Sequence, residues 1–353
     1  MNLLFFPLFL IVSHLNLLNN DSLCFNSYNY FSSTAELKIT QDSFGKALNL
    51  YKEAFTLVRK PLKRDLYNAA VCSAILKDTD FCYFTTKQLL LKGLRCKDFQ
   101  RNKIFKVFRK SLKWKLLLIQ EDSFRSIYER GLNKVVIKEI ADMDRRDQEV
   151  RWHYPRLRKI QKDTLRIIDS INCNKFLKIC SLSGFPSEEL IGYQNIELYK
   201  ISLHHFSYYK ELFPLIFHVL CDAYNNHLIP SSLITYLVDM NARVQSKTIV
   251  YGNIAYYAYR RKEYSPLFAE NPKILECING KRKAMGCLSF QEYQKIAKFQ
   301  SFPSAIRTIL ATLFHKQKFE FNREWYYEFV IGRNPIYKQT IAMEKYFEFN
   351  KCN

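Results

Sequence analysis

Apolar residues recur every three or four positions along much of the chain, which is the spacing of amphipathic α-helices. In the stretch "SFGKALNLYKEAFTLVRK" the apolar positions form one stripe, with Ser43 as a candidate N-cap and Pro61 just past the end. The stretches "RDLYNAAVCSAILKD" and "DFCYFTTKQLLLKG" follow, and the second ends at Gly93. The pattern therefore predicts three successive helices after residue 43.

This succession of helices resembles a tetratricopeptide-type helical hairpin. Small residues fall where the helices would cross, bulky residues flank them, and a turn lies between. The resemblance covers about one and a half repeats, and Thr86 stands where the repeat has an aromatic residue. It implies a scaffold whose concave face holds a partner protein or peptide; an ordinary helix pair explains the pattern equally well.

Glycine and proline are scarce, with nine and ten residues among 353, which favours long helices over sandwiches or barrels. We expect a mainly α protein with N-terminal tetratricopeptide-like hairpins followed by a helical domain. At most one short β-arm is expected, from "SKTIVYGN" (246–253). The expected segments are an apolar N-terminal segment, a polar linker, a hairpin module, a helical domain of unknown function and an aromatic-rich extension, at 1–24, 25–43, 44–130, 131–300 and 301–353.

The N-terminus carries an apolar run from Leu3 to Val12, which suits the central region of a secretory signal. No Lys or Arg precedes the run, and the nearest cleavage pattern, around Cys24, is poor. We expect an exported protein, periplasmic or secreted. The alternative is an uncleaved segment that anchors the chain in a membrane.

Ten cysteines are scattered without a C-x-x-C pair, so zinc and redox motifs are absent. Most of the cysteines fall on the apolar faces of the predicted helices, which indicates buried thiols. In an exported chain a few of them could instead form disulfide bonds.

The net charge of +21 predicts attraction to polyanions, and it concentrates between residues 87 and 115, which hold eleven Lys or Arg residues and one acid. Within "NKIFKVFRKSLKWK" we expect one amphipathic helix whose apolar face comprises Ile104, Phe105, Phe108 and Leu112. Such a helix could lie on anionic lipid or on a nucleic-acid backbone. No recognition motif accompanies it, so specific nucleic-acid binding is not expected. The alternative is a docked helix with a solvated basic back.

The stretch "DMDRRDQEVR" (142–151) is the richest in candidate chemistry. The apolar stripe through Ile140 and Met143 continues into Asp147 and then Arg151, which are four positions apart. A stripe that becomes ionic is either leaving the core or entering a polar pocket.

This stretch and four later ones resemble a bacterial protein family of unknown function. Its pattern is D-Q-x-x-R, then G-[WF]-P, a helix with a histidine, an acid–arginine pair, Q-x-Y-G and an arginine before G-L. The matching positions are Asp147, Gln148, Arg151, Gly184, Pro186, Gly192, His205, Asp239, Tyr251, Gly252 and Arg282. Met240 and Ile249 stand where the family has an arginine and a glutamine, so a family site could be impaired here.

These residues supply acid–base and anion-binding groups. His205 could act as a general base oriented by Asp147 or Asp239. A ligand would contact Arg151, Gln148, Tyr251 and Arg282. The alternative is a buried polar network that holds helices in register.

The sequence lacks the nucleophile-elbow, zinc-protease and phosphate-loop motifs, so neither a metal nor a cofactor is expected. It favours an exported helical binding or scaffold protein. The alternatives are a hydrolase-like or anion-binding enzyme that uses the His, Asp and Arg residues, and a polyanion binder that uses residues 87–115.

Overall fold

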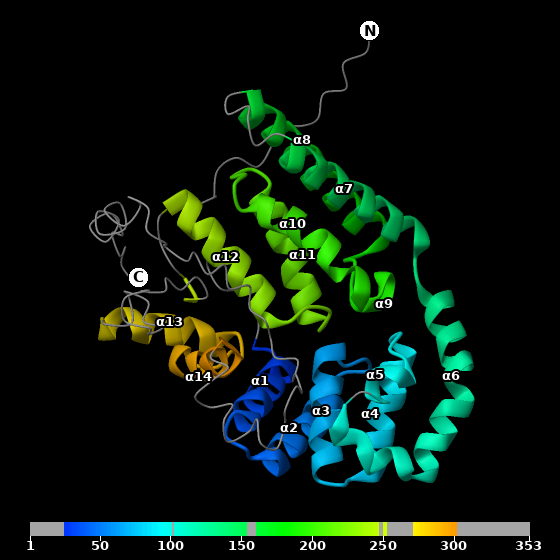
Figure 1. Ribbon diagram of the computed structural model, residues 1–353. Coiled ribbons are helices and arrows are strands. Elements are labelled where there is room, and N and C mark those ends of the chain that lie inside the picture. The colour runs from blue at the N-terminus through cyan, green and yellow to red at the C-terminus, as the bar shows by residue number, and fades with distance from the viewer. Residues whose placement is uncertain (1–24, 101, 154–159, 247–249, 253–270, 302–353) are drawn as a thin grey trace.

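A computed structural model describes residues 25–100, 102–153, 160–246, 250–252 and 271–301. These residues are mainly helical and include no strand, which confirms the predicted mainly α class (Figure 1). The expected apolar segment 1–24 lies outside the described residues, as do half of the expected β-arm (247–249 and 253) and all but Ser301 of the C-terminal extension. The described part of the arm, residues 246 and 250–252, forms no strand.

The N-terminal part consists of two hairpins of 13-residue helices. Helix α1 (Ser27–Ile39) packs on α2 (Phe44–Thr56), and α3 (Lys63–Ile75) packs on α4 (Thr79–Leu91). Asp78 caps α4, because its side chain accepts a hydrogen bond from the backbone N–H of Phe81. The hairpin arrangement expected from residue 44 onward is therefore present, and it begins one helix earlier.

The predicted linker 25–43 is wrong, because most of it forms the buried helix α1. Polar residues share the buried face of this helix with apolar ones. The Tyr28 hydroxyl donates to Asp65 Oδ2 at 2.5 Å, and Glu36, which is 1% exposed, pairs with Arg64 Nε at 3.0 Å. These partners lie in α3, outside the segment itself. The polar composition of the segment therefore indicated a loop, because it gave no sign of the partners that stabilise the helix.

The predicted amphipathic helix across residues 102–115 is also wrong. After the short helix α5 (Cys96–Gln100), the chain makes two 3₁₀ turns, η2 (Lys103–Lys106) and η3 (Phe108–Lys110). Helix α6 (Leu112–Gly131) starts only after Ser111, whose hydroxyl accepts from the Trp114 N–H. Phe105 and Phe108 are buried as expected, but Leu112 is 76% exposed.

The second part is built around two long helices, α7 (Lys134–His153) and α8 (Ile160–Ser183), which pack against each other and against α10 (Ile196–Phe206). A large apolar core joins these helices to α11 and α12. The remaining elements are α9 (Glu188–Ile191), η4 (Tyr193–Asn195), α11 (Phe213–Asn225), α12 (Ser231–Ser246), α13 (Pro272–Ala284) and α14 (Phe290–Ser301).

The two parts share packing. Leu288 and Ile296, near the end of the described chain, belong to the same apolar cluster as α1 and α2. The Asn26 side-chain amide donates to the Tyr224 carbonyl at 2.9 Å. The predicted boundary at residues 130 and 131 falls at the break between α6 and α7, where Leu132 is extended. The hairpins therefore pack directly beside the second domain.

The cysteines Cys72, Cys82, Cys96, Cys173, Cys180, Cys221 and Cys287 are free and buried, which agrees with their apolar positions in the sequence. Cys277 is disulfide-bonded. Among the described residues, no helix is both long and apolar enough to cross a bilayer.

Candidate functional site

Helix α7 turns Asp147 toward the interior and leaves Arg151 at the edge. The stripe through Ile140 and Met143 is buried, and Asp147 extends it with 1% exposure. The Arg151 Nε donates to Asp147 Oδ2 at 3.0 Å, while about one third of the Arg151 side chain stays exposed (33%). The ionic end of the stripe thus enters a polar cluster.

Two further helices complete this cluster. Asp169 of α8 accepts from Arg151 Nη2 at 2.7 Å. His205 of α10 places its Nε2 3.1 Å from Asp147 Oδ1, and its Nδ1 3.4 Å from Asp169 Oδ2. We call these four side chains the histidine cluster: Asp147, Arg151, Asp169 and His205.

The two carboxylates of the histidine cluster respond oppositely to their surroundings. Burial opposes ionisation of Asp147, but hydrogen bonds with His205 and Arg151 outweigh it and lower the pKa of Asp147 to about 2. For Asp169, burial is the larger effect, so its pKa is raised despite the nearby charges of His205 and Arg151. Asp147 is therefore the permanent anion, and Asp169 holds a proton more readily.

The neighbouring His204 has a different environment. Its two ring nitrogens lie 3.1 Å from the Tyr236 hydroxyl and 3.2 Å from the Tyr208 hydroxyl. Burial, together with the charges of His205 and Arg151, lowers the pKa of His204 to about 4. This imidazole stays neutral near pH 7 and serves as a hydrogen-bonding residue of the core.

Other residues of the resemblance meet around a different loop. Asp239 Oδ1 accepts from the backbone N–H groups of Val250 and Tyr251, at 2.8 and 2.7 Å. Arg282, which is 2% exposed, donates from Nη1 to the Tyr251 carbonyl at 2.9 Å and from Nε to the Leu288 carbonyl at 2.6 Å. These contacts hold the backbone of residues 250–251 in place.

The candidate residues thus divide between two places. The carboxylates beside His205 are Asp147 and Asp169, and the contacts described for Asp239 are to the loop backbone. Exposed Gln148 donates from Nε2 to Asp147 Oδ2 at 2.8 Å and so lies at the rim of the histidine cluster. Met240 is buried in the large apolar core. Ile249 lies outside the described residues.

Asp169 is the functional candidate that the sequence analysis missed. It precedes Asn172, Cys173 and Phe176, which are buried on one face of α8, at helical spacing. An apolar stripe that ends in a carboxylate is the signal that singled out Asp147. The same rule applied to α8 would have found Asp169.

Asp147, Asp169 and His205 could together offer ligands to a metal, because one ligand atom from each lies within 4.8 Å of the others. Carboxylate and imidazole ligands suit divalent ions such as Mn²⁺ or Zn²⁺. The Arg151 Nη2 lies 2.7 Å from Asp169 Oδ1 and 3.0 Å from His205 Nε2. In this arrangement the guanidinium supplies the positive charge, so a metal would have to displace it.

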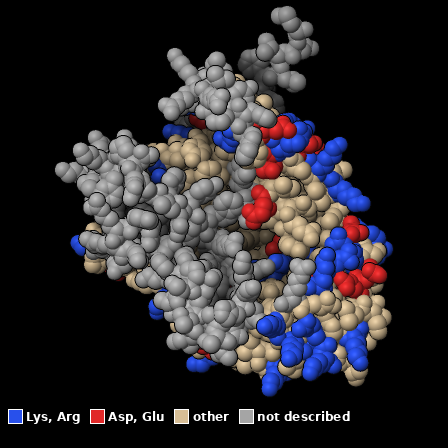
Figure 2. Space-filling view, in the orientation of Figure 1, with Lys and Arg blue, Asp and Glu red and all other residues tan. Residues whose placement is uncertain are grey.

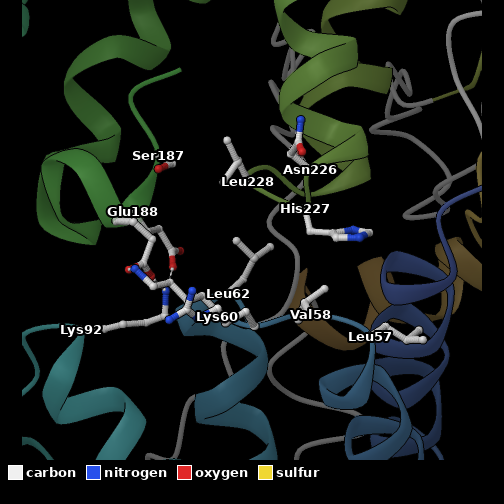
Figure 3. Close-up of a pocket in the computed structure, with 12 residues that line it drawn as sticks. Leu57, Val58, Lys60, Leu62, Lys92, Ser187, Glu188, Asn226, His227 and Leu228 are labelled. Carbon is white, nitrogen blue, oxygen red and sulfur yellow. Dashed lines mark hydrogen bonds and ion pairs between the residues drawn. The ribbon is translucent and has the colours of Figure 1, made fainter. Parts of the chain in front are cut away.

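A separate cavity of about 280 Å³ lies between the hairpins and the second domain (Figure 3). Lys60 and Lys92 reach it from the hairpins and pair with Glu189 and Glu188, at 2.8 and 3.3 Å. The rest of the lining mixes apolar residues such as Leu62 and Leu228 with polar ones such as Asn226 and His227. Since both acids already have cationic partners, this cavity is best described as part of the interface between the two parts.

Comparisons of the chain with protein-family models, with curated proteins and with solved structures gave no match.

Proposed function

We propose that the histidine cluster is an acid–base site of the hydrolase type that accepts an anionic substrate. The observation that supports this function is the convergence of its four side chains, from three helices, within hydrogen-bonding distance. An imidazole between two carboxylates is suited to take up and return a proton. The partly exposed guanidinium of Arg151 provides the positive charge for an anionic group of the substrate.

Arg151 also controls the base in this proposal. Its Nη2 lies 3.0 Å from His205 Nε2 and competes for the lone pair that a general base needs. A substrate anion that draws the guanidinium outward frees this nitrogen to accept a proton from water while the water oxygen bonds to the acyl or phosphoryl centre of the substrate. The bond to the leaving group then breaks, and the imidazolium returns the proton to that group. Asp147 and Asp169 stabilise the imidazolium, each from one side of the ring.

The test is hydrolysis of p-nitrophenyl phosphate, an anionic ester, by the full chain, with the neutral ester p-nitrophenyl acetate as the slower comparison substrate. We expect His205→Gln to reduce the rate about 100-fold, within the range for loss of a general base. His218→Gln is the matched control, because His218 also lies beside an aspartate, Asp222 at 3.8 Å, but is 79% exposed. Absence of turnover by the wild type, or equal rates for wild type and His205→Gln, contradicts the proposal.

A second candidate function, binding of a protein or peptide partner, is supported by the paired 13-residue helices α1 to α4. In this proposal they form a tetratricopeptide-like scaffold. A photo-cross-linking residue at Phe84 of α4, which is 41% exposed, should capture such a partner in cells. The same residue at Leu182 of α8, which is 75% exposed, should not. Equal capture at both positions contradicts a binding face on the hairpins.

We also propose that the chain is exported, on the strength of the apolar run from Leu3 to Val12. The alternative of an uncleaved membrane anchor uses the same run. N-terminal sequencing of protein recovered from host fractions separates these outcomes. Export predicts a shortened N-terminus outside the cytoplasm, an anchor predicts an intact one in the membrane fraction, and an intact cytoplasmic chain contradicts both.

A further inference from the structure

Helix α6 carries apolar residues on two opposite faces. Its inner face packs on the hairpins and comprises Trp114, Leu117, Phe124 and Tyr128. Its outer face comprises Leu112, Leu116, Ile119 and Ile127, which are 76%, 48%, 78% and 46% exposed. At 3.6 residues per turn, these outer residues fall within an arc of about 80°. We call them the outer stripe of α6.

The position of α6 leaves this stripe open to the surroundings. The helix runs along one edge of the molecule, on the right in Figure 1. Single exposed apolar residues are ordinary on protein surfaces, but aligned ones mark an interaction surface. Val107, between the two 3₁₀ turns that precede α6, is a further exposed apolar residue (54%). The stripe is therefore a face that lacks a covering element among the described residues.

Basic side chains accompany the N-terminal half of the stripe. Lys103, Lys106 and Lys110 are exposed on the two 3₁₀ turns, and Lys115 is exposed on α6 itself. Figure 2 shows Lys and Arg side chains gathered in the lower right part of the molecule, over α4 and α5, which lie on the inner side of α6 in Figure 1. On α6 itself, Lys115 lies one step of about 40° from Ile119 around the helix axis, at the border of the outer stripe. The surface thus combines large aliphatic side chains with lysines at their border.

We propose that the outer stripe of α6 and the basic turns before it bind the surface of an anionic lipid bilayer. Aliphatic side chains insert among the acyl chains near the headgroups, and lysines at their border contact the lipid phosphates. A helix at the edge of the molecule presents a convex surface, and a convex surface can contact a flat bilayer more readily than a concave groove can.

Other occupants fit these side chains less well. Single-stranded nucleic acids are held by stacking on aromatic residues, whereas the exposed apolar side chains of this surface are Leu, Ile and Val. A second copy of the chain, packed in parallel through the same stripe, would bring the two sets of lysines toward each other. An anionic bilayer complements both the apolar character and the charge.

The test is cosedimentation of the full chain with large vesicles. We expect binding to phosphatidylcholine vesicles that contain about one third phosphatidylglycerol, weaker binding to pure phosphatidylcholine, and loss of affinity as salt is added. The variant Leu112→Ser/Ile119→Ser should bind the anionic vesicles at least about tenfold more weakly. The matched control, Ile167→Ser/Leu182→Ser, removes aliphatic residues of α8 that are 60% and 75% exposed and should bind as the wild type does.

Because the apolar run from Leu3 to Val12 is the same in all three proteins, a difference between the double variants reports on α6. Equal binding of the two variants overturns the proposal, as does wild-type indifference to phosphatidylglycerol. Binding to single-stranded DNA without binding to vesicles would assign the surface to nucleic acid instead. Self-association that only Leu112→Ser/Ile119→Ser abolishes would assign it to a second copy.

Discussion

Asp147 and Asp169 flank one imidazole, yet their protons are held with opposite strength. Asp147 is almost fully buried, and the hydrogen bonds that its carboxylate accepts from His205 and Arg151 favour its charged form enough to overcome burial. Asp169 pairs with Arg151 as well, but burial and the charge of Asp147 favour its neutral form. One carboxylate therefore contributes to stability as an anion, whereas ionisation of the other costs free energy.

The stability of the fold should depend on Asp147 in a defined pH window. The pKa of Asp147 falls from about 3.9 in an unfolded chain to about 2 when folded. Its contribution is therefore complete above about pH 4 and disappears as pH falls through 2. We expect Asp147→Asn to lower the free energy of unfolding by about 2 to 3 kcal/mol at pH 7. Urea denaturation of both proteins should show the difference shrinking toward pH 2.

Asp169→Asn is the natural comparison for this measurement. Because the pKa of Asp169 is raised in the folded state, the protonated carboxyl group stabilises the fold, and this stabilisation is lost as pH rises and the group ionises. An uncharged amide at this position avoids the free-energy cost of the buried negative charge. The loss of the Arg151 hydrogen bond partly cancels this gain. We expect a smaller destabilisation at pH 7 than for Asp147→Asn. A larger one would mean that Asp169, not Asp147, is the stabilising anion.

At the residue scale, the sequence identified half of the histidine cluster from periodicity. The stripe through Ile140 and Met143 indicated that Asp147 could face inward, and the structure places it there. His205 came from the family resemblance. Periodicity does not predict which helices pack together, because the pattern of each helix indicates only which of its own faces is buried. Hence the meeting of α7, α8 and α10 at one point could not be read from the chain.

At the element scale, α1 shows how composition can mislead. The segment 25–43 that contains it is rich in Ser, Asn and Tyr, and Ser and Asn favour turns and loops in a single sequence. In the fold, Asn29 and Glu36 are buried, and the buried Asn29 Oδ1 accepts from the Ser231 N–H at 3.2 Å. The helix is stabilised by long-range polar contacts. Helix propensity and apolar periodicity do not predict such long-range polar contacts.

The buried pairs of Arg64 should therefore be essential for α1. Arg64 is 12% exposed and lies 3.0 Å from Glu36 and 2.7 Å from Asp65, both of which are almost fully buried. Arg64→Met leaves two buried carboxylates without their cation and should lower the free energy of unfolding by about 3 to 5 kcal/mol. Arg145→Met is the control, because Arg145 also has two acidic partners but is 60% exposed. We expect its effect to stay below about 1 kcal/mol in urea titrations. Similar losses would contradict the role of burial.

Tyr128 of α6 fits between two glycines that end helices of different parts. A Cβ on Gly192 would meet the Tyr128 hydroxyl, and a Cβ on Gly93 would meet its ring. Both glycines also have positive φ, +79° and +96°, which side-chain-bearing residues adopt at a cost. These glycines permit α4, α6 and α9 to approach one another closely.

Gly192→Ala should therefore lower the melting temperature and cost about 1 to 3 kcal/mol, because it adds a steric overlap to backbone strain. Gly45→Ala provides the opposite case. Gly45 lies in α2 with open space around its Cβ position, so alanine should be neutral or stabilise by up to about 1 kcal/mol. Calorimetry of both variants checks the contrast, and an unchanged melting temperature for Gly192→Ala would contradict the close packing of Tyr128.

At the scale of the whole molecule, the mainly α class and the break near residue 131 could be predicted from scarce glycine and proline and from helical periodicity. The association of the chain's early and late segments could not. Leu288 and Ile296 pack with α1 and α2, more than 200 residues away in sequence. Apolar periodicity predicts which face of a helix is buried, but it does not predict which other helix packs on that face. No turn motif in the sequence indicates that segments so far apart along the chain pack together.

The ion pairs that join the hairpins to the second domain give this long-range packing a measurable consequence. Lys92, at the end of α4, is 10% exposed and contacts both Glu188 and Glu189. Although burial opposes their charges, mutual attraction raises the pKa of Lys92 and lowers that of Glu189. A raised lysine pKa stabilises the fold below its unfolded value of about 10.4, and a lowered glutamate pKa does so above about 4.3. The pair should therefore stabilise the interface between these limits.

Lys92→Ala should accordingly cost about 2 to 4 kcal/mol near pH 7, since it leaves two glutamates without a buried cation. Lys60→Ala is the matched control, because Lys60 also binds Glu189, at 2.8 Å, but is 59% exposed and should cost less than about 1 kcal/mol. A double-mutant cycle of Lys92 with Glu189, followed by urea unfolding, measures their coupling directly. If the hairpins and the second domain unfold as one unit, the loss appears in a single shifted transition. Two separated transitions, with only one sensitive to Lys92, would show that the interface does not couple the parts.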